Sequence, residues 1–308
     1  MELPPVFTRA TAVRAGWAPR DVDALVRSGT WTALRRGVYA VTATLPADPR
    51  RAHAVAIAAA ALATAYDVVG SHESAAVVHG LPTFAVHVGP PVLTRVRARG
   101  IDRPDAVRVA PLVSQVPDSH RTTVDGAPVT TLARTAADLA RKGPALSAVV
   151  LLDGALRAGV PVDHVRAVLD DCRGWPGSLR AQRWLAFADG KAESPLESVA
   201  RWRFEQFELP RPVLQAVLGG HDGPIGRVDF YWEDHRTVGE ADGMAKYRSA
   251  TGVPDFAVLR AEKVREDALR DAGFEVFRFT WEEAVHRPLL LEQRAQRAFA
   301  RGDRRRAS

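Results

Sequence analysis

The sequence predicts a mixed α+β fold in which helices alternate with short strands along most of the chain. Its 308 residues are long enough for about two domains, and a hydrophobic content of 46% is sufficient for packed cores. The first forty residues combine two short helical patterns with a strand pair. Residues 190–290 follow the order helix, three strands, helix, strand, which is typical of a small α/β domain with a mixed sheet.

The N-terminal residues, 1–45, have the pattern of a winged helix-turn-helix. We expect a helix at residues 8–15, a turn at Gly16 and a second helix at residues 19–27. Residues 30–41 then predict a two-stranded wing with Arg35-Arg36-Gly37 at or beside its tip. In this motif the second helix enters the major groove and basic side chains reach phosphates. We therefore expect DNA contacts from Arg9, Arg14, Arg20, Arg27, Arg35 and Arg36.

The motif F-T-R-A-x-A-x-x-A-G, followed by L-x-R-G-V-Y-A, covers residues 7–41. It resembles the winged-helix domain of AbiEi-type antitoxins from type IV toxin–antitoxin systems. The resemblance implies a domain that binds double-stranded promoter DNA and represses its own operon. It also implies a cognate nucleotidyltransferase-like toxin as a candidate partner.

The middle region, residues 46–180, is less specific and is similar to the part that follows the winged helix in such antitoxins. It predicts helices at residues 71–78, 131–140 and 146–158, and a strand at residues 107–112. Thr130 or Thr131 is expected to cap the second of these helices, on which Arg134 and Asp138 form an i,i+4 pair. A glycine-rich joint is expected at residues 173–190.

Residues 225–247 space three carboxylates along a predicted strand pair. Residues 227–232 alternate in character, so Asp229 faces away from the apolar set, and residues 237–242 form a second strand. Glu240 and Asp242 lie on one side of that strand, and pairing can bring Asp229 beside Glu240. Such carboxylates repel one another unless a cation lies between them. Oxygen ligands suit Mg²⁺ or Mn²⁺, so the cluster predicts a metal site.

Two helices flank this strand pair. Ser194-Pro195-Leu196-Glu197 has the form of a capping box, which predicts a helix from there to about residue 207. For Glu197 the capping role alone explains the residue as well as a catalytic role does. Residues 261–270 predict a charged helix that carries Lys263, and residues 274–280 predict a further strand.

The linked motifs E-S-P-L-E, G-R-V-D-F-Y-W, G-E-A-D-G-x-x-K-Y and A-E-K-x-R-E-D-x-L-R-x-A-G-F-E-V-F-R-F-T-W resemble the DUF559, very-short-patch-repair-like branch of the PD-(D/E)xK nuclease superfamily. The resemblance implies a restriction-endonuclease-like α/β domain at residues 190–290. Asp229, Glu240 and Asp242 would bind the metal that activates water for phosphodiester hydrolysis, with Glu197 contributed by the first helix. Asp242 stands where the superfamily usually has lysine, and Lys246 and Lys263 are the candidates to replace it.

Two functions follow from these patterns. The first is a DNA-binding protein with a Mg²⁺-dependent endonuclease domain. The second is a non-catalytic, antitoxin-like transcriptional repressor whose C-terminal domain dimerises or holds DNA. The residues leave open whether DNA or RNA is the substrate and whether the chain forms a homodimer.

Composition adds weaker expectations. The formal charge of +6 favours a polyanionic partner, and residues 291–308 are expected to form a basic tail that is disordered over residues 301–306. A single cysteine, Cys172, excludes disulfides within the chain and fits a reducing cytoplasm. The apolar run at residues 52–65 is too short to span a bilayer, and residues 1–9 lack the apolar segment of a signal peptide. We therefore expect a cytoplasmic protein without a membrane partner.

Overall fold

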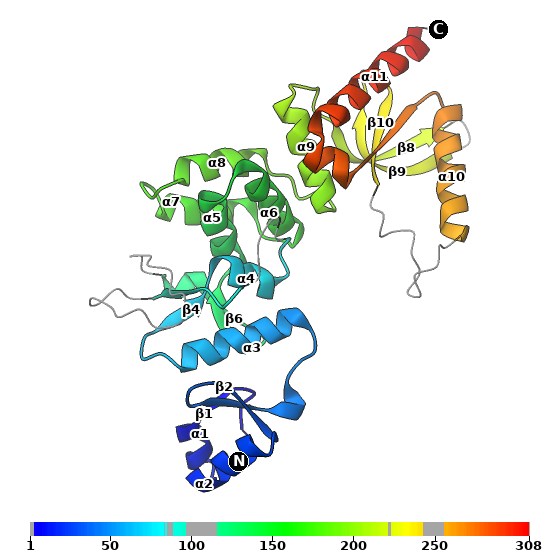
Figure 1. The fold of residues 1–308 in the computed structure, drawn as a ribbon. Coiled ribbons are helices and arrows are strands. Elements are labelled where there is room, and N and C mark those ends of the chain that lie inside the picture. Colours follow the sequence, from blue (N-terminus) through cyan, green and yellow to red (C-terminus); the bar gives the residue numbers. More distant parts are fainter. Residues whose placement is uncertain are drawn as a thin grey trace. The chain divides into compact units, whose positions relative to one another are not determined.

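The chain divides into two compact units in the computed structural model, which describes residues 3–82, 84, 89–96, 116–220, 223–242 and 256–307. Unit 1 comprises residues 1–155 and 159–187, and unit 2 comprises residues 156–158 and 188–308. Each combines helices with sheets, so the predicted mixed α+β class is confirmed (Figure 1). The division at residues 187 and 188 lies inside the glycine-rich segment at residues 173–190.

Unit 1 begins with a small winged head. Its elements are β1 (Phe7–Thr8), α1 (Arg9–Arg14), α2 (Pro19–Arg27), β2 (Trp31–Arg35) and β3 (Val38–Val41), and the antiparallel sheet has the order β1-β3-β2. The Thr8 side chain caps α1 by accepting a hydrogen bond from the Thr11 amide, and Pro19 opens α2. The core contains Phe7, Ala12, Val22, Trp31 and Tyr39.

The rest of unit 1 packs helices on a four-stranded sheet of order β5-β4-β7-β6. Its strands are β4 (Val68–Gly70), β5 (Leu93–Arg95), β6 (Arg121–Val124) and β7 (Ala127–Thr130). Its helices are α3 (Pro49–Leu62), α4 (His72–His79), α5 (Leu132–Lys142), α6 (Ala145–Arg157), α7 (Val162–Asp171) and α8 (Ser178–Phe187), with 3-10 turns at Thr42–Thr44 and Asp118–His120. The strand predicted at residues 107–112 lies outside the described residues.

A buried ion network holds α5 in place. Thr131 caps the helix by accepting a hydrogen bond from the Arg134 amide. The Arg134 Nε atom lies 2.7 Å from Asp138 Oδ2, as the i,i+4 spacing predicts, and Arg141 Nη1 lies 3.0 Å from Asp138 Oδ1. All three charged side chains are buried. A buried carboxylate that contacts two guanidiniums has its charge and hydrogen bonds paired, whereas a buried carboxylate or guanidinium alone would destabilise the fold.

Unit 2 is built on a mixed sheet of order β11-β10-β9-β8. Its elements are α9 (Pro195–Gln206), β8 (Val213–Gly220), β9 (Gly223–Trp232), β10 (Thr237–Asp242), α10 (Phe256–Asp271), β11 (Glu275–Thr280), a π-helical turn (Glu282–His286) and α11 (Pro288–Ala307). Strands β8, β9 and β10 pair antiparallel, whereas β10 and β11 pair parallel. The connection between those parallel strands contains α10, as parallel pairing requires a crossover.

Helices cover both faces of this sheet (Figure 1). On one face an aromatic cluster contacts α9 through Phe204 and α11 through Phe299, and it includes Phe230, Trp232 and Phe279 from the strands. A separate aliphatic cluster packs against Leu269 of α10. The cluster includes Leu218, Val228, Val238, Phe274 and Val276.

The predicted disordered tail is wrong, because residues 301–306 belong to α11. Ala295, Ala298 and Phe299 form a buried stripe at helical spacing, which anchors the helix to the sheet. Arg301 and Arg305 pair with the buried carboxylate of Glu275 on β11, at 2.6 and 3.5 Å. The arginine-rich composition suggested disorder, but the segment is a helix, and Glu275 of the sheet partly neutralises its positive charge. Within the described ranges, no helix is both long enough and apolar enough to cross a membrane.

Candidate carboxylate site and nucleic-acid interface

Asp229 and Glu240 come from neighbouring strands. β9 and β10 pair Trp232 with Thr237 and Phe230 with Gly239, and Asp229 and Glu240 are the residues directly beyond this last pair. The Asp229 Oδ2 atom accepts a hydrogen bond of 2.8 Å from the Ala241 amide. The alternation in β9 thus buries Phe230 and Trp232 and leaves Asp229 on the opposite face, as the sequence pattern predicts.

Glu197 joins this pair from the first turn of α9. Ser194 Oγ accepts a hydrogen bond from the Glu197 amide at 3.2 Å and donates one to Glu197 Oε1 at 2.8 Å. The Glu193 amide donates to Glu197 Oε2 at 2.8 Å. The capping role of Glu197 is therefore present. Its carboxylate is nevertheless also connected to Asp229, because Gln215 Nε2 donates to both at 2.9 and 3.3 Å.

The electrostatics of the site show an excess of negative charge. Burial, followed by the charge of Asp229, raises the pKa of Glu240 to about 7, and burial together with Asp229 also raises the pKa of Glu197. Arg265 acts in the opposite direction and lowers the pKa of Glu240, since its Nη1 atom lies 2.9 Å from Glu240 Oε1. Asp242 lies two residues beyond Glu240 on β10. Its Oδ1 atom is buried without a hydrogen-bond partner among the described residues.

The cation beside these acids is Arg265, which sequence reasoning missed. Lys263 is exposed on α10 and makes no ion pair with the residues that the structure describes, and Lys246 lies outside them. Arg265 precedes the buried Leu269 by four residues, so both project from α10 toward the sheet. This spacing is the signal that could have identified Arg265. No comparable sequence signal identifies Gln215.

The donor chemistry of the site fits a hard divalent cation. All four acids offer oxygen ligands, and one of them, Asp242, has a buried carboxylate oxygen without a hydrogen-bond partner among the described residues. The side chains do not converge on one point, however. Within the part of the chain that is described, no three His, Cys, Asp or Glu side chains are placed to hold a metal ion. A cation would have to compete with Arg265 for Glu240.

The six predicted DNA-contacting arginines of the head differ in availability. Arg9 forms an ion pair with Asp23 that links α1 to α2, and Arg14 donates to Thr11 Oγ1 at 3.3 Å. Arg27 donates to the Asp23 carbonyl. Arg20 is 90% exposed at the start of α2, with Asp21 as a distant partner at 3.9 Å. Arg20 and Arg27 project from the exposed side of α2, seven residues apart and so on one helical face.

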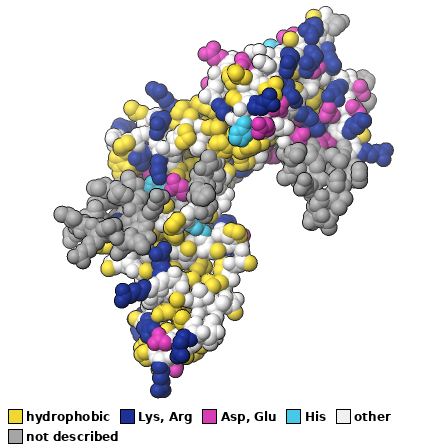
Figure 2. Space-filling view, in the orientation of Figure 1, with side chains coloured by type: hydrophobic (Ala, Val, Ile, Leu, Met, Phe, Trp, Pro, Cys, Tyr) yellow, Lys and Arg dark blue, Asp and Glu magenta, His cyan; other side chains and the backbone are white. Residues whose placement is uncertain are grey.

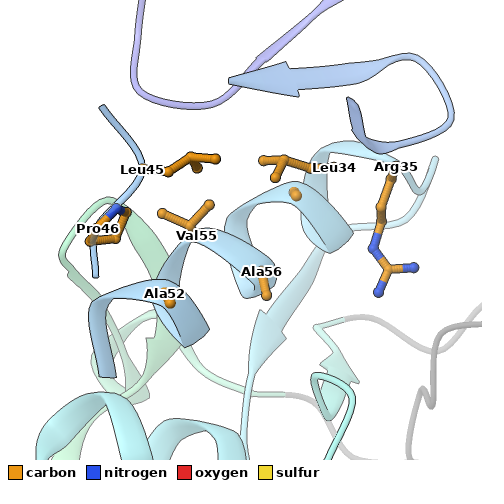
Figure 3. Close-up of a pocket in the computed structure, with 8 residues that line it drawn as sticks. Leu34, Arg35, Leu45, Pro46, Ala52, Val55 and Ala56 are labelled. Atoms are coloured by element: carbon orange, nitrogen blue, oxygen red, sulfur yellow. The ribbon is translucent and has the colours of Figure 1, made fainter. Parts of the chain in front are cut away.

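The wing turns tightly at Gly37, whose φ of +74° suits glycine. Arg36 is exposed at this turn, whereas Arg35 lines a pocket of about 290 Å³ between β2 and α3 (Figure 3). The other lining side chains are apolar: Leu34, Leu45, Pro46, Ala52, Val55, Ala56 and Ala59. Arg36 is therefore the wing arginine best placed to reach a phosphate. Figure 2 shows further Lys and Arg side chains gathered over α11.

Comparisons with known proteins identify the head. Two uncharacterised proteins of Mycobacterium tuberculosis, from strains CDC 1551 and H37Rv, are each 32% identical to this chain over 179 residues. The match covers 58% of this chain and 64% of each relative, so the chain spans just under two thirds of their length. Residues 2–42 match the family described as transcriptional regulator, AbiEi antitoxin. The winged head is therefore an AbiEi antitoxin-type domain, as the motif at residues 7–41 indicates.

Proposed function

We propose that this chain is a DNA-binding regulator whose winged head places it on duplex DNA upstream of its own gene. The observation that carries the proposal is the family match over residues 2–42. The geometry supports it, because α2 exposes Arg20 and Arg27 on one face and the wing exposes Arg36. These positions suit a major-groove helix and a phosphate contact beside it.

Fluorescence anisotropy with the chain's own upstream DNA tests this function. The double variant Arg35→Ala with Arg36→Ala is expected to lose binding, because it removes both wing cations. Arg166→Ala is the matched control, since Arg166 is an exposed arginine of α7 paired with Asp163. Equal binding by the wild type and the double variant would refute the assigned wing contact. Absence of binding by the wild type would refute the regulator itself.

A second function, metal-dependent phosphodiester hydrolysis, is carried by the carboxylate site of unit 2. It rests on the resemblance to the DUF559 nuclease branch and on the juxtaposition of Asp229 with Glu240 and Glu197. Asp229, Glu240 and Asp242 would hold Mg²⁺ or Mn²⁺. A bound ion of this kind supplies charge neutralisation and lowers the pKa of a coordinated water.

The residues of the chain itself would do the rest. Arg265 is attached to α10, and its guanidinium lies at the edge of the acid cluster. Arg265 would donate to a phosphate oxygen, which its planar fork suits. It would thereby take the role for which Lys246 and Lys263 are the candidates in the sequence. Gln215 and Ser194 hold the Glu197 carboxylate in place by hydrogen bonds at the first turn of α9.

Incubation of supercoiled plasmid with the full chain and Mg²⁺ or Mn²⁺ tests hydrolysis. Nicking by the wild type that Asp229→Ala abolishes is the expected result, with Asp234→Ala as the control on the exposed β9–β10 turn. Equal nicking by the wild type and Asp229→Ala would refute the site. No nicking of plasmid, and no cleavage of RNA in a parallel reaction, would leave a non-catalytic repressor.

Two partners complete the proposal. A nucleotidyltransferase-like toxin is expected to be encoded beside an antitoxin of this type. A homodimer would present two winged heads to two half-sites. Light scattering of the pure chain measures the oligomeric state, and co-expression with the neighbouring gene product tests the toxin.

A further inference from the structure

Asp23 places a negative charge on the face of α2 that is proposed to enter DNA. It lies three residues after Arg20 and four residues before Arg27, and this spacing puts all three side chains on one face of the helix. The Asp23 side chain is 55% exposed. Duplex DNA carries one negative charge per roughly 1.7 Å of its axis, so a bare carboxylate between the two arginines would oppose binding.

Arg9 of α1 neutralises this carboxylate through two hydrogen bonds. Its Nη1 atom donates to Asp23 Oδ2 at 3.4 Å, and its Nη2 atom donates to Asp23 Oδ1. A bidentate pair of this kind is the strong form of the contact between an arginine and a carboxylate. The hydrogen bond from Arg9 lowers the pKa of Asp23. The acid therefore stays ionised at neutral pH, and only a partner can balance its charge.

The Arg9 guanidinium is held against the head. Its Nη2 atom also lies 3.5 Å from the hydroxyl oxygen of Tyr39 on β3, and the Arg9 amide donates to the Gly37 carbonyl at 3.0 Å. The Arg9 side chain is 40% exposed, compared with 90% for Arg20 at the start of α2. Contacts with α2, β3 and the wing turn therefore keep Arg9 beside Asp23.

Arg27 does not provide the same neutralisation, although it lies one turn further along α2. Its Nε atom donates to the backbone carbonyl of Asp23 at 3.3 Å and not to the carboxylate. Among the effects on the pKa of Asp23, the hydrogen bond from Arg9 is the largest and the charge of Arg27 is the smallest. Asp21, the other acid of α2, accepts a hydrogen bond from the Ala18 amide at the start of the helix.

We propose that Arg9 is a positioning residue of the DNA-binding face, which acts by masking the charge of Asp23 and not by contacting a phosphate itself. This inference rests on the proposed function of the head. With the ion pair intact, α2 presents Arg20 and Arg27 to DNA without a net negative charge between them. Without Arg9, the exposed carboxylate of Asp23 would face the phosphates directly and repel them.

A double-mutant cycle in the full chain separates masking from a phosphate contact. Binding of the chain's own upstream DNA is measured by fluorescence anisotropy across a salt titration for Arg9→Gln, Asp23→Asn and the double variant. The matched control is the same cycle with Arg211→Gln and Glu205→Gln. Arg211 forms a bidentate pair with the carboxylate of Glu205 in unit 2, at 2.8 and 3.0 Å.

Arg9→Gln is expected to raise the dissociation constant about tenfold and to reduce the salt slope by about 1, because it uncovers Asp23. Asp23→Asn is expected to bind at least as tightly as the wild type, because it removes the acid and releases Arg9. The double variant is expected to regain the affinity and the salt slope of the wild type, because the acid and its partner are both gone. The control cycle is expected to match the wild type throughout.

A double variant that binds as weakly as Arg9→Gln would overturn the proposal, because a phosphate contact by Arg9 is lost whatever the charge at position 23. Weaker binding by Asp23→Asn than by the wild type would also overturn it, since the ion pair would then hold the helix and not mask a charge. This second result decides the matter alone if thermal unfolding shows that Arg9→Gln does not fold. Absence of DNA binding by the wild type would refute the function of the head, and the role of Arg9 with it.

Discussion

Replacement of Glu240 by glutamine is predicted to stabilise unit 2 above neutral pH. A rise in the pKa of Glu240 from its ordinary 4.5 to about 7 means that the folded state binds this proton more tightly than the unfolded state. The stability contributed by the protonated group is fully present below pH 4.5 and is lost as the pH rises through 7. At pH 8 the resulting loss in the free energy of unfolding is about 3 kcal/mol.

Glutamine is isosteric with the protonated acid and removes this loss, but it also removes the charged contact with Arg265. The pKa of about 7 already includes that contact, because Arg265 is among the groups that lower the pKa of Glu240, so no separate loss is subtracted. Glu240→Gln is therefore expected to gain about 3 kcal/mol over the wild type at pH 8 and to differ little from it at pH 5. Urea unfolding in EDTA at the two pH values measures both quantities.

Glu275→Gln is the matched control for this experiment. Glu275 is also buried on the same sheet, but it faces two guanidiniums, those of Arg301 and Arg305. Its replacement removes the carboxylate charge that both cations contact, so the same substitution is expected to destabilise unit 2 at pH 8. If Glu240→Gln follows the same pH dependence as the wild type, Glu240 is not the group that titrates, and the account of the acid cluster given above is wrong.

Three further predictions concern other parts of the chain. Arg20→Ala and Arg36→Ala are each expected to reduce the slope of log affinity for DNA against log salt concentration by about 1, because each removes one phosphate contact. An unchanged slope in a salt titration followed by anisotropy would contradict the assigned contacts. Asp138→Ala leaves two buried guanidiniums unpaired and is expected to cost about 3–5 kcal/mol of unfolding free energy, and a loss below about 1 kcal/mol in urea would show that the network is hydrated. Gly302→Ala would place a methyl group 2.0 Å from the His235 carbonyl oxygen, so it is expected to loosen α11 and lower the melting temperature, although alanine is the better helix former. The comparison variant is Ala300→Gly, at an exposed site of the same helix, which is expected to cost about 1 kcal/mol of unfolding free energy. A rise in the melting temperature of Gly302→Ala would show that α11 does not pack on the sheet.

The elements that the sequence predicts well are those with local signals at both ends. Pro19 starts α2, and Ser194 with Glu197 starts α9, so the helix starts follow from cap chemistry. The placement of Asp229 near Glu240 follows from a period of two and a short turn. The identity of the head follows from a motif that the family comparison confirms.

What the sequence could not provide depends on contacts between distant segments. Arg265 and Lys263 are both basic residues of one charged helix, and only the packing of Leu269 against the sheet decides which of them faces the acids. The pair of hydrogen bonds from Gln215 to Glu197 and Asp229 depends on a left-handed backbone that no propensity predicts. The helical structure of residues 301–306 was not predicted, because exposed arginines in α11 outnumber the buried Ala295, Ala298 and Phe299.

The strand order of unit 2 has a consequence for the route by which this unit forms. β9 and β10 are joined by a short turn, so their pairing needs little loop closure and belongs to the fast, local class of folding events. β11 joins only after the long crossover that contains α10, and such non-local parallel pairing is slow. Asp229 and Glu240 therefore meet before Arg265 arrives to screen them. The early hairpin is destabilised by its own charges, and refolding of unit 2 should accelerate in mild acid.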